Sequence, residues 1–268
     1  MKAIFDVGAD DGMNGILFAF KNPKIKVFSF EPIRGSKKKI KANLKKVSTF
    51  FDIKIKNYEI INTAVSNYNG YTTFYETHYK VASSLLEPKQ KKKLDKFWTQ
   101  TKDLLKQTEI KGLKTNKSYK VKVIKLETFC KKKSIKLIHY LHVDAQGHDL
   151  KVIEGLGKYK KYLLQGVAEV CKNRKLTIYK NEKSFYELKK SLKKWGFVVN
   201  FVEDVQRGSG YNNVYFKCKK KHFSHDNKNS FKIPNNRLGR MFRRIFLNKT
   251  NFKDFFYLWI WKFRKVYS

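Results

Sequence analysis

IFDVGADDG, residues 4–12, is the stretch from which the rest of the chain can be interpreted. A short apolar run reaches Asp6, two glycines follow at Gly8 and Gly12, and ILFAF at residues 16–20 has helical spacing. This pattern predicts a strand, a tight loop and a helix. Glycine in such a loop lets backbone N–H groups approach a ligand closely. The alternative is an ordinary turn in which the glycines do nothing more than reverse the chain.

A second apolar run, VFSF at residues 27–30, ends at Glu31-Pro32. A glycine-rich turn after one strand, with an acid at the end of the next, is how dinucleotide-binding folds hold a ribose. The spacing does not match G-x-G-x-x-G. It does match acid-x-G-x-G-x-G, with Asp10 in place of the middle glycine, and this resembles the first motif of S-adenosylmethionine (SAM) methyltransferases. The two acids therefore indicate a nucleoside ligand.

Strand-like and helix-like segments alternate along the chain, which predicts an α/β fold with a mostly parallel sheet. Asn69-Gly70 predicts a hairpin that joins residues 64–66 to residues 71–75. The last two strands lie close together in sequence, so we expect an antiparallel strand to close the sheet. The other expected strands are residues 2–7, 26–30, 58–63, 119–124, 137–143, 163–170, 197–202 and 211–216, and the expected helices are residues 13–20, 37–47, 126–133, 150–156 and 184–195.

Five short motifs occur in register: FDVGADDG (5–12), FEP (30–32), NTAVS (62–66), SSL (83–85) and LHVDAQGHDL (141–150). Together they resemble the FkbM-type methyltransferases of the class I SAM-dependent superfamily, over about residues 2–217. The resemblance implies a Rossmann-like seven-stranded sheet with helices on both faces. It also implies methyl transfer from SAM, usually to a hydroxyl of a sugar, glycan, polyketide or related metabolite.

Carried onto this sequence, the resemblance and the loop pattern predict the cofactor-binding residues Asp6, Gly8, Ala9, Asp10, Gly12, Glu31, Pro32 and Ala64. Two positions depart from the pattern. Asp10 stands where many relatives carry Asn, and Gln146 stands where many carry Glu. The sequence begins directly at the first strand, so we expect no N-terminal helical cap over the substrate.

Two residues are candidates for the general base that an alcohol acceptor needs. Asp144 follows a strongly apolar strand, and the carboxyl ends of parallel strands border the ligand crevice. His148 is the second candidate, because its unperturbed pKa of about 6.5 suits proton transfer near neutrality. Asp144 could instead cap the following helix, and His148 could be a surface turn residue. Glu169 could join Asp144 as an oxygen ligand of Mg²⁺, although the spacing leaves a metal undecided.

The net charge is +38, from 60 basic and 22 acidic residues. A polyanion partner is one interpretation. The other is the Lys-, Asn-, Ile-, Phe- and Tyr-rich composition of an AT-rich genome, which the even spread of Lys favours. Nucleic acid therefore ranks below a hydroxyl-bearing small molecule as the acceptor. The rival functions are an RNA 2′-O-methyltransferase and a non-catalytic protein that binds nucleic acid or a membrane surface.

Compartment and membrane signals favour a cytoplasmic protein. Cys130, Cys171 and Cys218 are odd in number and widely spaced, which indicates neither a disulfide framework nor a zinc site. Asp6 interrupts the first apolar run too early for a signal peptide. No stretch approaches the roughly 18 apolar residues of a membrane span.

The expected domain organisation is a methyltransferase domain over residues 1–218, a polar linker over 219–236 and a basic, aromatic helical tail over 237–268. Within the domain, residues 81–118 form an insertion that is either a substrate lid or a solvated surface helix. The tail contains FFYLWIW at residues 255–261, which is too short to cross a bilayer. It is either a helix packed on the domain or an interfacial helix that holds the enzyme on an anionic membrane.

Truncation after Lys219 separates these two interpretations of the tail. Each basic group near an anionic surface is worth about 1 kcal/mol, so an interfacial tail should make the full-length chain sediment with anionic liposomes. The truncated chain should then remain in the supernatant and keep its SAM binding. Equal sedimentation of the two proteins, or unfolding of the truncated one, would show that the tail is a structural helix.

Overall fold

The structure is a computed structural model that describes residues 1–89, 113–205 and 210–219. It confirms the predicted α/β fold. The large sheet is built from β1 (Lys2–Val7), β2 (Lys26–Phe30), β3 (Tyr58–Ile61), β7 (Leu137–Val143), β8 (Gln165–Cys171), β9 (Phe197–Asp204) and β10 (Tyr211–Cys218). A small sheet contains β4 (Ala64–Ser66), β5 (Gly70–Thr77) and β6 (Thr115–Lys125). The helices are α1 (Met13–Lys21), α2 (Ser36–Phe51), α5 (Leu126–Lys132), α6 (Asp149–Glu154) and α7 (Phe185–Lys194), with short 3-10 turns η1 (Lys80–Ala82), η2 (Gly157–Tyr162) and η3 (Arg174–Leu176).

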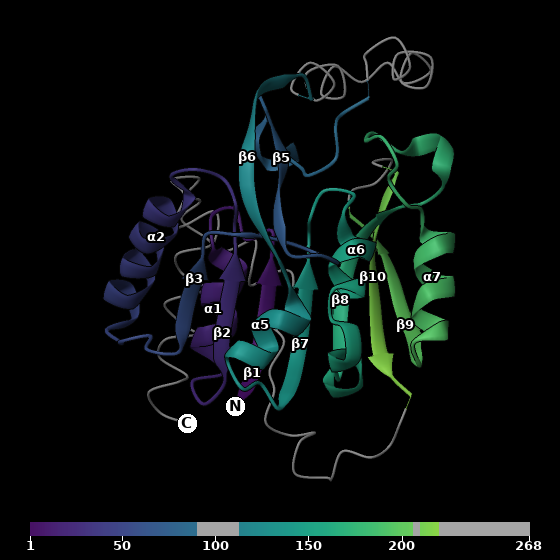
Figure 1. Ribbon diagram of the computed structural model, residues 1–268. Helices are drawn as coiled ribbons and strands as arrows, with labels where there is room; N and C mark the ends of the chain where they lie inside the picture. The colour runs from purple at the N-terminus through teal and green to yellow at the C-terminus, as the bar shows by residue number, and fades with distance from the viewer. Residues whose placement is uncertain (90–112, 206–209, 220–268) are drawn as a thin grey trace.

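The large sheet has the strand order β3-β2-β1-β7-β8-β10-β9 (Figure 1). The five strands β3, β2, β1, β7 and β8 are parallel to one another, and β10 runs antiparallel to both β8 and β9. The predicted antiparallel strand is therefore present, inserted between its two neighbours. Because parallel strands run in the same direction, their carboxyl ends all lie at one edge of the sheet.

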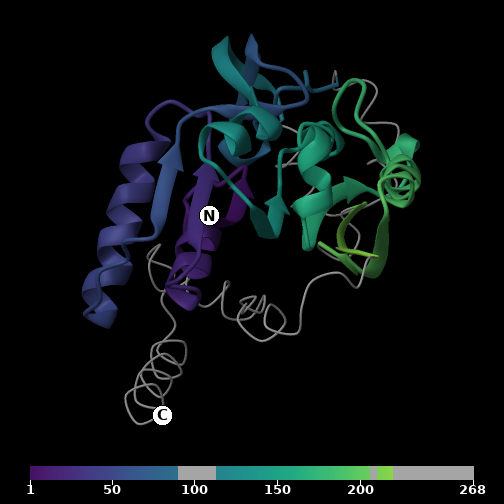
Figure 2. The ribbon, with the colours of Figure 1, turned by 60° about the horizontal axis from the view of Figure 1, so that its bottom comes forward.

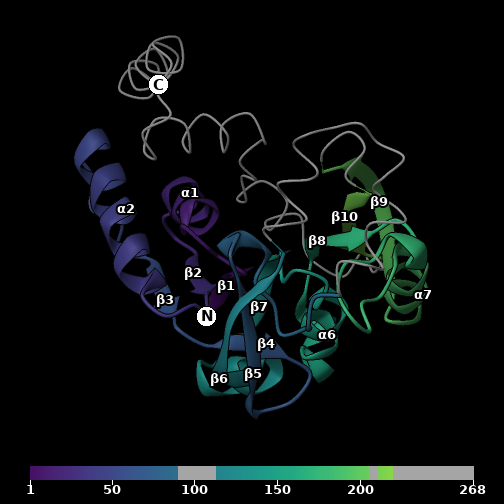
Figure 3. The same cartoon turned by 90° about the horizontal axis from the view of Figure 1, so that it is seen from above.

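Helices cover both faces of this sheet, with α1 and α2 on one face and α6 and α7 on the other (Figures 2 and 3). The alternation of apolar residues along β1 explains the two layers. Phe5 points to one face, where it packs against Phe28, Phe30 and Phe129 with ring centroids 5.9 to 6.0 Å away. Ile4 points to the other face and belongs to the cluster beneath α1.

The small sheet stands above the carboxyl edge of the large one (Figure 1), and it corrects the hairpin prediction. Its strand order is β4-β6-β5, so β4 and β5 each pair with β6 and not with one another. A tight hairpin turn of that type needs a positive φ at both central residues. Gly70 has one, at 141°, whereas Asn69 does not. The Asn69 side chain instead bonds Lys125 N at 2.8 Å and Thr128 Oγ1 at 2.9 Å, which carries the connection across the end of β6.

Three predicted segments fall wholly or mainly outside the described residues. They are the centre of the 81–118 insertion, the linker beyond Lys219 and the tail over 237–268. The end of the expected insertion is part of β6, which begins at Thr115. Within the ranges that the structure describes, no helix combines the length and the apolar character that a membrane crossing requires.

Gly8, directly after β1, lies against the backbone of Asp144, which directly follows the neighbouring strand β7. Its φ is +80°, and a Cβ atom at this position would lie 1.8 Å from the carbonyl oxygen of Asp144. The Asp144 N–H also donates to Val7 O at 2.9 Å. Glycine is required here because two segments of backbone touch, and not only because the chain turns.

Substitution of Gly8 by alanine should destabilise the fold far more than the same change at Gly35. Both residues have a φ near +80°, but a Cβ on Gly35 would meet nothing within 4 Å. Gly35→Ala should therefore cost only the left-handed conformation, about 1–2 kcal/mol. Gly8→Ala must in addition displace the backbone of Asp144. Urea unfolding of the two variants tests this, and equal losses of stability would contradict the contact.

Candidate functional site

The carboxyl edge of the parallel strands gathers most of the polar residues predicted from the sequence. The loop after β1 carries Asp10, Glu31 directly follows β2, and Asp144 directly follows β7. Glu169 lies near the end of β8. Strand order alone brings these acids together, because β2, β1, β7 and β8 are consecutive in the sheet.

The loop over residues 8–12 is held firmly by its own backbone. The N–H groups of Gly8 and Ala9 both donate to Phe30 O, at 3.0 and 3.1 Å, and Gly12 N donates to Ala9 O at 2.7 Å. The Ala9 side chain is buried and packs with Met13 at the start of α1. A Cβ on Gly12 would lie 2.4 Å from the Ile40 side chain of α2. The loop is thus a rigid link between β1, β2 and the two helices.

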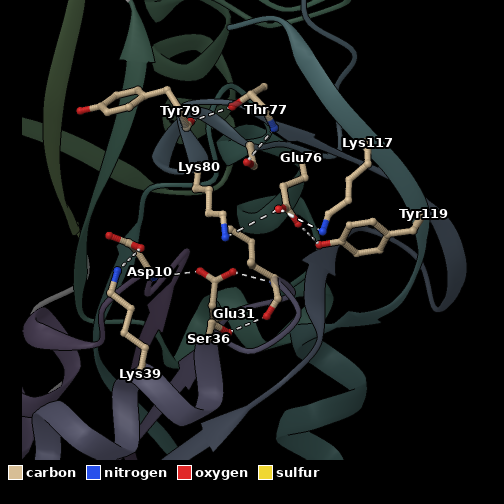
Figure 4. Close-up of polar contacts among 12 residues, drawn as sticks. Asp10, Glu31, Ser36, Lys39, Glu76, Thr77, Tyr79, Lys80, Lys117 and Tyr119 are labelled. Carbon is tan, nitrogen blue, oxygen red and sulfur yellow. Dashed lines mark hydrogen bonds and ion pairs between the residues drawn. The ribbon is translucent and has the colours of Figure 1, made fainter. Parts of the chain in front are cut away.

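Glu31 is the acid most closely joined to this loop. Its carboxylate accepts Asp10 N and Ile33 N, each at 2.8 Å, and the side chain is only 4% exposed (Figure 4). Burial removes water from the carboxylate and raises the pKa of Glu31 to about 7, although the two N–H donors act in the opposite direction. Both carboxylate oxygens are therefore held in fixed positions.

Asp10 and Pro32 flank Glu31 and are more open to solvent. Asp10 has a left-handed φ of 46°, and its side chain is 36% exposed. Lys39 Nζ lies 3.1 Å from its carboxylate (Figure 4). An exposed pair of this kind is worth about 0–1 kcal/mol, so a ligand can displace it. Pro32 is half-buried.

Two further predicted cofactor residues, Asp6 and Ala64, also have their side chains in the interior. Asp6 is fully buried, and its carboxylate accepts Ser29 Oγ from β2 and pairs with His142 Nδ1 from β7, both at 2.9 Å. This carboxylate therefore joins three neighbouring strands beneath α1. Ala64 packs into the core of the small sheet with Phe74.

Asp144 lies directly beside the loop after β1, through its backbone contact with Gly8. Its Oδ1 accepts Gln146 Nε2 at 2.8 Å. The helix that follows begins at Asp149 with His148 as its N-cap residue. The alternative that Asp144 caps this helix is therefore wrong.

His148 is buried, at 9% exposure, so the alternative of a surface turn residue is also wrong. Its Nε2 lies 2.8 Å from Ser66 Oγ at the end of β4, which ties α6 to the small sheet. Burial, with a smaller effect of the Lys151 charge, lowers the pKa of His148 to about 4. The imidazole is thus neutral at physiological pH and is engaged with Ser66.

Further acids surround Asp144. Burial first, and the charge of Asp144 second, raise the pKa values of Asp149 and Glu169 well above their usual range. Glu182 contributes to both shifts and is itself buried. Across residues 1–89, 113–205 and 210–219, no three His, Cys, Asp or Glu side chains are arranged to hold a metal ion. The Mg²⁺ pair of Asp144 and Glu169 stays a prediction.

Comparison with known proteins identifies the family. Residues 6–199, well over half of the chain, match the profile described as "Methyltransferase FkbM domain". The chain belongs to the FkbM methyltransferase family. A comparison with curated protein sequences finds no significant match.

Three solved structures illustrate what this FkbM domain is similar to. Methyltransferase FkbM from Methylobacillus flagellatus KT is 9% identical, with a TM-score of 0.49 and coverage of 81% of this chain and 44% of that one. The chain thus spans less than half the length of that structure. TrmK of M. capricolum, solved with S-adenosyl-homocysteine, is 13% identical, with a TM-score of 0.42 and coverage of 99% and 90%. Precorrin-6y C5,15-methyltransferase from Geobacter metallireducens GS-15 is 10% identical, with a TM-score of 0.39 and coverage of 81% and 79%.

One polar group of this FkbM domain was missed by the sequence analysis. Glu76 of β5 is only 2% exposed, and it accepts Tyr119 OH at 2.8 Å, with Lys117 Nζ at 3.5 Å and Lys80 Nζ at 3.9 Å (Figure 4). The Arg34 guanidinium lies 4.5 Å from the centre of the Tyr119 ring, which joins the small sheet to the chain just after Glu31. In the sequence, the signal for the burial of Glu76 was its spacing: residues two apart in a strand lie on the same face, so Glu76 shares the face of the apolar Phe74.

The raised pKa of Glu31 gives the protein a pH-dependent stability. A carboxyl whose pKa rises from 4.5 to about 7 on folding stabilises the fold below pH 4.5, and this stability is lost as the pH rises through 7. Glu31→Gln cannot titrate, so the stability that the wild type loses as the pH rises from 5 to 8, on the order of 3 kcal/mol, should not be lost in the variant.

Urea unfolding at several pH values measures this difference. Glu87→Gln, at a half-exposed position that pairs with Lys180 on the surface, is the matched control and should show the same pH dependence as the wild type. An unchanged slope between pH 5 and 8 in Glu31→Gln would show that Glu31 is not the titrating group.

Proposed function

We propose that this FkbM-family chain is an S-adenosylmethionine-dependent O-methyltransferase that acts on a hydroxyl of a sugar, glycan or related small molecule. One observation carries the proposal. The loop after β1 touches Glu31 through Asp10 N on one side and the Asp144 backbone through Gly8 on the other. A nucleoside-binding acid and a candidate base therefore flank the same rigid loop.

The residues on the cofactor side of this loop fit S-adenosylmethionine. A ribose diol offers two O–H donors, and the Glu31 carboxylate is a fixed, desolvated acceptor for them. Its two backbone bonds use one lone pair on each oxygen, which leaves further capacity on both. Asp10 supplies a second carboxylate for a cationic ligand group once Lys39 is displaced. Glycines 8 and 12 contribute by letting the loop approach β7 and α2, and not by making room for the ligand.

The remaining task of the chain is to align the acceptor and to take its proton. Bound S-adenosylmethionine supplies a methyl group that is already activated on a sulfonium. Asp144 is the residue that we assign as general base, because a carboxylate at the end of a parallel strand faces the ligand edge. His148 is less suited to this role, because it is engaged with Ser66 and buried.

The surroundings of Asp144 favour an uncharged hydroxyl as the acceptor. Asp149, Glu169 and Glu182 lie close enough to interact with one another or with Asp144. Carboxyl groups can accept hydrogen bonds from sugar hydroxyls and donate to them, and an ionised carboxylate such as the proposed base would repel a phosphate backbone. A cluster of carboxyl groups beside Asp144, within a chain of net charge +38, thus supports a neutral acceptor over RNA.

Two measurements test the proposal. Calorimetry should show that the wild type binds S-adenosylhomocysteine. In an activity assay, the wild type should transfer the labelled methyl group of S-adenosylmethionine into a glycan or small-molecule fraction. Asp144→Asn should lower turnover by about 10²–10⁴-fold, the usual contribution of a general base, with cofactor affinity within a few fold.

Asp52→Asn, on the exposed C-terminal end of α2, is the control and should behave as the wild type. Failure to bind S-adenosylhomocysteine would overturn the assignment of the cofactor. Incorporation of label into RNA alone would replace the small-molecule acceptor by the nucleic-acid alternative.

A further inference from the structure

Gln146 occupies an unusual position in the turn between β7 and α6. Its φ is +51°, in the left-handed region, and Gly147 after it has a φ of +82°. A residue with a side chain costs about 1–2 kcal/mol in this conformation, so the surrounding structure must hold it there.

Three hydrogen bonds hold Gln146 in place. Its amide Nε2 donates to Asp144 Oδ1 at 2.8 Å, and its Oε1 accepts Tyr179 OH at 3.0 Å. Its backbone oxygen accepts Ser84 Oγ at 2.7 Å. The buried Tyr179 hydroxyl also lies 2.7 Å from Ala82 O, so its single proton is shared between two acceptors.

These partners decide which way the amide of Gln146 points. A carboxylate is an acceptor only, so the NH₂ group must face Asp144 and the amide oxygen must face the phenol. The amide donor fixes the Asp144 carboxylate in orientation and favours its ionised form, which is the form that can take a proton.

We propose that Gln146 is a positioning residue for Asp144 in methyl transfer, held in place by Tyr179 and by the 82–84 segment. The inference rests on the function proposed above. It also explains how an amide serves at this position, since its NH₂ group can donate to an ionised neighbour.

The groups around Asp144 make such a donor valuable. Asp149 from α6, Glu169 from β8, and Glu182 and Tyr179 from the segment before α7 surround it, and the acids among them oppose each other's ionisation. A carboxyl at position 146 would stand within hydrogen-bond distance of Asp144, and the two would share one proton, as coupled acids do.

The test is a carbon-13 NMR titration of the full chain with labelled Asp carboxyl groups, in which Asp144→Asn identifies the Asp144 signal. Gln146→Glu should raise the titration midpoint of Asp144 by about one pH unit or more, and Gln146→Ala should raise it by less. Gln165→Glu, at the N-terminal end of β8 and away from the carboxyl edge of the sheet, adds the same charge and should leave the midpoint unchanged.

Turnover supplies the second readout. In Gln146→Glu, activity should rise at a higher pH than in the wild type, and this shift should match the shift of the Asp144 midpoint. The KM for S-adenosylmethionine should stay within a few fold. A purely structural role would lower activity equally at every pH. Should Gln146→Glu fail to fold, Gln146→Ala carries the test alone.

The two proposals fail in different ways. Unchanged Asp144 midpoints in the folded Gln146 variants overturn the inference, even when S-adenosylhomocysteine binds normally. Absence of S-adenosylhomocysteine binding by the wild type overturns the proposed function.

Discussion

The close contact between Gly8 and the backbone of Asp144 is the constraint on which the rest of the site depends. With only 1.8 Å between a Cβ at Gly8 and the Asp144 carbonyl oxygen, no side chain fits between the end of β7 and the loop after β1. The contact joins the two halves of the site. Glu31 is tied to the loop on one side, and Asp144 forms the other.

Asp6 strengthens the same junction from below. A buried carboxylate is costly unless it is paired, and here it is paired with Ser29 from one neighbouring strand and His142 from the other. Gly15 of α1 lies directly above, where a Cβ would come within 2.8 Å of Asp6 Oδ2. The acid of the first motif thus holds strands and helix in register, and we infer that it serves the ligand through the loop that it supports.

Charge is distributed unevenly between the surface and the site. The chain carries +38 overall, while the side chains around Asp144 are acidic and buried. Desolvation raises the pKa values of these acids, and each further charge raises those of its neighbours. The amide of Gln146 is a neutral donor within this group, and its Nε2 faces the Asp144 carboxylate.

The sequence by itself determined the alternation of strands and helices, the closing antiparallel strand and the edge at which Asp10, Glu31 and Asp144 meet. These follow from local hydrophobic periodicity and from the rule that parallel strands end together. The tertiary structure alone decided the partners. It placed β6 between β4 and β5, turned His148 toward Ser66, buried Asp6 beneath α1 and brought Glu76 to Tyr119. Each of these depends on pairing between residues far apart in the chain, and periodicity within one segment carries no record of which distant segment will lie beside it.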